Sequence, residues 1–105
     1  MGEIKVDKND ETAVVSPEEK IDVSNAKDFK DELITLYEQG FEKIIVDFAD
    51  VERIQSSGVG ALLSFNDKLL KDGGKLKIIN VNKDYIKKIF QMTKLHKIIE
   101  VEGMN

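Results

Sequence analysis

Short apolar runs alternate with helix-periodic stretches along the chain, and this alternation constrains the fold more than any other feature. Residues 44–48 and 76–81 are apolar runs of strand length, typical of strands buried in a parallel sheet. Residues 24–40 and 56–71 place apolar side chains at helical spacing. Strands that alternate with helices pair in parallel through right-handed crossovers. The sequence therefore predicts an α/β fold.

The two ends of the chain add further elements. Residues 3–7 and 12–16 have strand character and flank an Asn9-Asp10 turn signal, which predicts an antiparallel hairpin. A short extended piece is expected at 20–23, and a third helix is expected after Asn82. Residues 98–101 fit either an edge strand or a terminal helix. The expected order is β-β-α-β-α-β-α-β, with a mixed, mostly parallel sheet and helices packed on it.

One domain is expected over residues 1–105. The chain has 105 residues, a common size for a single domain, and contains neither a repeat nor a linker-like segment. Apolar residues make up 41% and charged residues 34%, a balance typical of a globular protein.

The charge pattern favours protein or small-molecule partners. The net charge is −4, and the basic residues, all Lys except Arg53, are spread along the chain rather than gathered into a cationic face. This pattern argues against direct binding to nucleic acid and against binding to an anionic membrane surface. No Cys is present, and no apolar stretch approaches a signal peptide or a membrane span. We therefore expect a cytoplasmic protein.

The segment Gln55-Ser56-Ser57-Gly58-Val59-Gly60 is the unusual stretch. Two glycines fall in the first turn of an expected helix, where each costs about 1 kcal/mol relative to Ala. One explanation is that a partner or phosphate must approach bare backbone. The other is tight packing of the helix against the sheet. The sequence leaves both explanations open.

A serine at a helix start has two possible roles. Its hydroxyl can cap the helix by accepting a backbone N–H. It can also receive a phosphate, whose charge of about −1.5 to −2 a helix N-terminus tolerates. The segment 50–60 leaves a strand and enters a helix, and ligands of open α/β sheets gather at such carboxyl ends of strands.

Nearly the whole chain resembles a STAS domain of the bacterial anti-sigma factor antagonist class. Beyond element order and size, two segments carry the resemblance. The Ile21-Asp22 pair within residues 20–26 is similar to the family's Leu-Asp pair ahead of its first long helix. Residues 54–63 are similar to the family's Asp-Ser-Ser-Gly-Leu-Gly loop and helix start.

The resemblance implies a protein-binding switch. Such an antagonist, a monomer or weak dimer when free, binds an anti-sigma factor and thereby frees a sigma factor. The anti-sigma factor is also a serine kinase that phosphorylates the antagonist and abolishes binding, and a serine phosphatase reverses the modification. Ser57 is the implied phosphorylation site. The implied partner-binding residues are Asp22, Ser24, Asn25, Gln55, Ser56, Gly58, Val59 and Gly60.

This sequence departs from the family pattern at two positions. Gln55 stands where the family usually has Asp, which removes a negative charge beside the serines. Glu19 stands where the family has a Gly shortly before its Leu-Asp pair. Both departures bear on the choice of partner more than on the fold.

Two other functions compete. Asp47, near a strand end, could be the phosphate acceptor of a receiver-like domain, but Asp7 and Asp10 are a poor match for the carboxylates that would hold its Mg²⁺. A STAS domain could instead be a scaffold module of a stress-signalling assembly, which would self-assemble stably. An enzyme is not expected, because His96 is the only His and neither a nucleotide-binding loop nor metal-ligand spacing is present. We therefore expect no catalytic residue, metal or cofactor.

Overall fold

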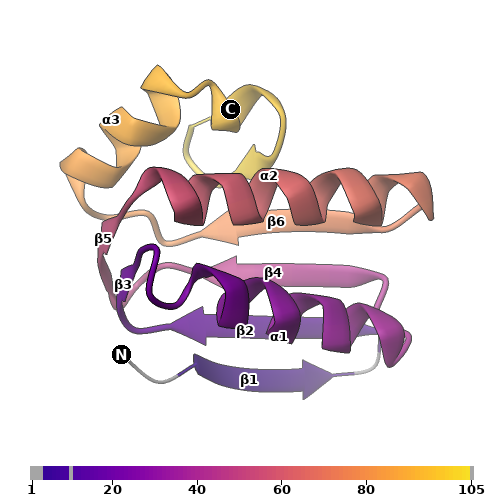
Figure 1. Ribbon diagram of the computed structural model, residues 1–105. Helices are drawn as coiled ribbons and strands as arrows, with labels where there is room; N and C mark the ends of the chain where they lie inside the picture. The colour runs from indigo at the N-terminus through magenta and orange to yellow at the C-terminus, as the bar shows by residue number, and fades with distance from the viewer. Residues whose placement is uncertain (1–3, 10, 105) are drawn as a thin grey trace.

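The centre of the protein is a five-stranded mixed sheet (Figure 1), seen in a computed structural model that describes residues 4–9 and 11–104. The spatial order of its strands is β1-β2-β4-β6-β7. The β1–β2 pair is antiparallel, and the other neighbours are parallel. This arrangement confirms the predicted fold class. The strands of this sheet are β1 (Ile4–Asn9), β2 (Thr12–Pro17), β4 (Lys43–Asp47), β6 (Lys75–Ile79) and β7 (Glu100–Val101).

A second sheet consists of two short parallel strands, β3 (Glu19–Ile21) and β5 (Val51–Ile54). The extended piece expected at 20–23 corresponds to β3. The strand β5 was not predicted, because the segment 50–60 was interpreted as a loop that enters a helix. Two exposed charged residues lie between buried Val51 and Ile54, so the segment lacks the alternation of a half-buried strand.

The helices are α1 (Ala26–Glu38), α2 (Ser56–Lys71) and α3 (Asp84–Met92), followed by the short 3₁₀-helix η1 (Leu95–Lys97). The residues before α1, α2 and α3 are Asn25, Gln55 and Lys83, and the side chain of none of these three caps its helix. The expected caps at Ser24-Asn25 and Asn82 are therefore absent. Among the described residues, no helix is long and apolar enough to cross a membrane.

Helices α1 and α2 lie side by side over one face of the main sheet (Figure 1). Phe29 and Leu33 of α1 and Phe65 of α2 are buried, together with Ile44 and Val46 of β4. The run 44–48 was expected to be buried on both faces of the sheet. Instead, buried and half-buried residues alternate along β4. This pattern fits a sheet whose second face is only partly covered.

Two predictions concern the elements near the two ends of the chain. The hairpin is confirmed, although Asp10 of its predicted turn and residue 3 of its predicted first strand lie outside the described residues. Residues 98–101 contain the edge strand β7 rather than a terminal helix. Gly40 follows α1 with φ +100°, a left-handed conformation that suits Gly at a helix end.

Candidate functional site

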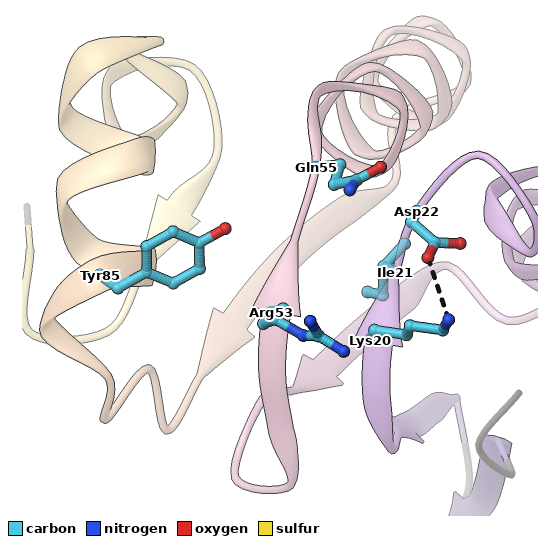
Figure 2. A pocket seen from close by; sticks show the side chains of 6 residues that line it. All are labelled: Lys20, Ile21, Asp22, Arg53, Gln55 and Tyr85. Carbon is cyan, nitrogen blue, oxygen red and sulfur yellow. Dashed lines mark ion pairs between the residues drawn. The ribbon is translucent and has the colours of Figure 1, made fainter.

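The loop after β3 and the start of α2 meet at one end of the molecule. The backbone N–H of Gln55 donates to the carbonyl oxygen of Ile21 at 2.9 Å, so two segments far apart in sequence are joined where β3 and β5 end. Figure 2 shows Asp22 and Gln55 on the facing segments. The fold therefore brings together the two sets of residues that the resemblance pointed to, those at 22–25 and those at 55–60.

Asp22 is braced by its own loop. Its Oδ1 accepts hydrogen bonds from the Ser24 hydroxyl at 2.5 Å and from the Ser24 backbone N–H at 2.9 Å. Its Oδ2 lies 3.4 Å from the ammonium nitrogen of Lys20. These contacts, the Ser24 hydroxyl above all, hold the pKa of Asp22 below its ordinary value. Asp22 therefore carries a fixed negative charge at neutral pH.

The Asn25 side chain stabilises the loop and is not exposed. Its side chain is buried, and its Oδ1 accepts the backbone N–H of Asp22 at 2.9 Å. Its Nδ2 donates to the carbonyl oxygen of Lys20 at 2.8 Å. Both ends of the amide are therefore used to fix the loop, so Asn25 positions Asp22 and Ser24 without presenting its own polar atoms.

The two glycines in the first turn of α2 lie in different surroundings. A Cβ on Gly58 would lie 2.7 Å from Ile21 Cγ2 and 2.8 Å from Ile54 Cγ1, so Gly58 permits close packing of α2 on the β3–β5 pair. A Cβ on exposed Gly60 would meet no atom within 4 Å among the described residues. Val59, between them, is buried in the core. Packing therefore explains Gly58, whereas the backbone at Gly60 is exposed and packing does not explain the glycine there.

The two serines also differ. Ser56, the first residue of α2, is exposed. Ser57 is partly buried, and its hydroxyl oxygen is buried without a hydrogen-bond partner in the described part of the chain. A hydroxyl that accepts phosphate must reach the active site of a kinase. The geometry thus favours Ser56, in contrast to the Ser57 of the sequence prediction.

A small pocket of about 110 Å³ opens beside these segments (Figure 2). Arg53 of β5 and Tyr85 of α3 line it, although the sequence interpretation included neither in the site. The Tyr85 hydroxyl donates to the carbonyl oxygen of Ile54 at 3.2 Å. Arg53 could have been singled out as the only Arg of the chain, whereas nothing local in the sequence brings Tyr85 to β5. The pocket is lined by Lys20, Ile21, Asp22, Arg53, Gln55 and Tyr85.

The residues of the competing interpretations have structural partners. Asp47 accepts hydrogen bonds from the backbone N–H of Ala49 and from Asn80 Nδ2, both at 2.9 Å. Asp7 belongs to β1, whereas Asp47 ends β4. Because β2 lies between these two strands, Asp7 is not on a strand next to that of Asp47. Within residues 4–9 and 11–104, no group of three or more His, Cys, Asp or Glu could hold a metal ion. Nδ1 of His96 lies 3.2 Å from the carbonyl oxygen of Phe90.

Residues 3–103 match the family model of the STAS domain. The chain belongs to the STAS domain family. The anti-sigma-B factor antagonist of Bacillus subtilis strain 168 is 30% identical to it over 100 residues, which are 95% of this chain and 90% of the relative.

Solved structures of STAS relatives have the same fold. An anti-sigma factor antagonist from Mycobacterium paratuberculosis has a TM-score of 0.85 at 21% identity, covering 96% of this chain and 85% of that one. The anti-sigma factor antagonist SpoIIAA, in its unphosphorylated form, has a TM-score of 0.71 at 22% identity, covering 86% of this chain and 83% of the other. SpoIIAA of Bacillus in its phosphorylated form has a TM-score of 0.74 at 20% identity, covering 96% and 92%.

Proposed function

We propose that this STAS domain is an anti-sigma factor antagonist, a regulatory binding protein rather than an enzyme. It binds an anti-sigma factor and so releases a sigma factor for transcription. The 30% identity to an anti-sigma-B factor antagonist over nearly the whole chain supports the partner class. The observation that carries the proposal is the exposed pair Ser56 and Gly60 on one helix start, beside the braced Asp22 loop.

The switch is phosphate on a serine at the start of α2, and Ser56 is its acceptor. Ser56 is exposed, whereas the hydroxyl oxygen of Ser57 is buried. The helix dipole favours negative charge at this end, so the modification leaves the fold intact. It adds bulk and charge to the surface on which the partner docks, and binding is lost.

The anti-sigma factor supplies the kinase activity, and a serine phosphatase reverses the modification. The antagonist acts in the cytoplasm and is a monomer or weak dimer when free. The substitution of Gln55 for the family's Asp makes the docking surface less acidic, which narrows the set of kinases that accept it.

The test is phosphorylation by each serine-kinase anti-sigma factor encoded in the same genome, followed by intact mass measurement and peptide mapping. We expect one phosphate on the wild type and on Ser57→Ala, and none on Ser56→Ala. Phosphate mapped to Ser57 would show that Ser57, and not Ser56, is the phosphate acceptor. A chain that binds no anti-sigma factor and instead assembles stably with itself would contradict the proposal and favour a scaffold.

A further inference from the structure

Two cations lie opposite each other on the β3–β5 pair. Lys20 and Arg53 are register partners in this parallel pair. Figure 2 shows the Arg53 side chain extending from β5 toward Lys20 on β3. Like charges at directly opposite positions destabilise a strand pair. The arrangement is therefore electrostatically unfavourable unless an anion lies between or beside the two side chains.

The described residues supply a negative charge to only one of the two cations. Lys20 has an ion pair with Asp22, whose other oxygen is committed to Ser24. Arg53 forms no ion pair with any described residue. The pocket lining therefore carries two positive charges and one negative charge, in a protein whose net charge is −4.

The size of the pocket restricts what it can hold. Its volume is about 110 Å³. Pockets for drug-sized ligands are roughly 300–1,000 Å³, while one water occupies about 30 Å³. A nucleotide is thus too large, whereas a single carboxylate or phosphate group fits. The Gln55 side-chain amide, which lines the same pocket, adds a hydrogen-bond donor.

We propose that Arg53 and Lys20 form a binding site for one oxyanion group at this end of β3 and β5. The planar guanidinium of Arg53 binds two oxygens of the anion, and the Lys20 ammonium neutralises its remaining charge. The site goes beyond the proposed switch, because it binds a free oxyanion in the unmodified protein. The oxyanion comes either from a docking protein or from a phosphate on Ser56.

The test is a titration of the isotope-labelled protein with inorganic phosphate, at constant ionic strength and pH 7, followed by two-dimensional NMR. We expect saturable shifts of the Arg53 Nε–H and Gln55 amide signals. The double variant Lys20→Gln/Arg53→Gln should lose the shift of the Gln55 amide, which is the signal that it shares with the wild type. Lys43→Gln is the matched control, because Lys43 is an exposed cation at the start of β4, and it should keep both shifts. Shifts that never saturate, or that survive in the double variant, would overturn the proposal.

Two more variants refine the result. Arg53→Lys keeps the charge but removes the planar fork, so we expect a several-fold weaker affinity for phosphate. Unchanged affinity would contradict the bidentate role of Arg53.

Ser56→Glu identifies the source of the anion. Weakened phosphate binding would indicate the chain's own modified serine, and unchanged binding would indicate a group carried by a docking protein.

Discussion

Gly58 and Gly60 are two residues apart in the same helical turn, yet their surroundings are opposite. Gly58 lies against the buried side chains of Ile21 and Ile54, and Gly60 lies in open space. The helix penalty of Gly applies to both positions. Only at Gly58 does packing offset it. The penalty at Gly60 therefore remains uncompensated in the free protein.

Substitution by Ala should separate the two glycines. Gly58→Ala forces a Cβ to within 2.7 Å of a buried side chain, and overpacking of this kind costs roughly 1–3 kcal/mol. Gly60→Ala should instead stabilise the protein by about 0.5–1 kcal/mol. Urea denaturation measures both free energies of unfolding. Equal effects of the two substitutions would contradict the packing assignment.

Gly60→Ala also tests the proposed docking surface. If a partner packs onto the bare backbone of Gly60, the variant should be more stable but bind the anti-sigma factor more weakly. Gly73→Ala is unsuitable as a control, because Gly73 has φ +81° and any side chain there is strained. Ser64→Ala is a suitable control for binding, because this exposed position on the same helix loses only a surface hydrogen bond from the Lys30 ammonium. Binding as tight as that of the wild type would show that Gly60 is not covered in the complex.

Asp22 makes the loop acid-sensitive. Its pKa is lowered in the folded state, chiefly by the Ser24 hydroxyl, from an unfolded value of about 3.9. Its stabilising contribution is therefore complete above that value and is lost as the pH falls through the lowered folded pKa. In Ser24→Ala the pKa of Asp22 should rise toward its ordinary value. Carboxyl NMR titration checks this, and an unchanged pKa would show that the backbone N–H at position 24 and Lys20 lower it instead.

At the scale of elements, the sequence predicted most of the fold because strongly periodic segments determine their own structure. The central strands, the three helices and the hairpin were all expected. Strand β5 was not, because its four residues take their conformation from pairing with β3, a contact between segments about thirty residues apart. The same pairing places Arg53 beside Lys20. Tertiary contacts of this kind leave no local signal in the sequence.

The meeting of the two candidate segments was predicted from the sequence, but the burial of several of their residues was not. The segments 22–25 and 55–60 do meet, as the resemblance implied. Asn25, Gly58 and Val59, however, are buried, and the hydroxyl of Ser57 is buried as well. Burial at a helix start depends on how the helix lies on the β3–β5 pair, which periodicity alone does not reveal.

The joint between β3 and α1 depends on Asn25. Asn25→Ala removes two hydrogen bonds and leaves the Asp22 N–H and the Lys20 carbonyl without their partner. We expect a loss of stability of about 1–3 kcal/mol. Asn82→Ala, at an exposed position before α3, serves as the control and should change stability little. Thermal denaturation of both variants measures the difference, and equal midpoints would contradict the bracing role.

At the scale of the whole molecule, the proposed switch lies at one end of a small domain. The helices and the main sheet bury a single core, and Ser56, the Asp22 loop and the Arg53 pocket lie together at one end of it. A phosphate on Ser56 would alter this surface without moving the core. Regulation of this kind requires no second conformation of the protein.

The most direct test is calorimetric titration of the anti-sigma factor with the antagonist before and after phosphorylation, with Ser56→Ala carried through the same kinase treatment. The account predicts tight binding by the untreated chain, loss of binding after treatment, and full binding by treated Ser56→Ala. Circular dichroism should show the same fold in all three samples. A chain phosphorylated on Ser56 that still binds as tightly as the untreated chain would contradict the account.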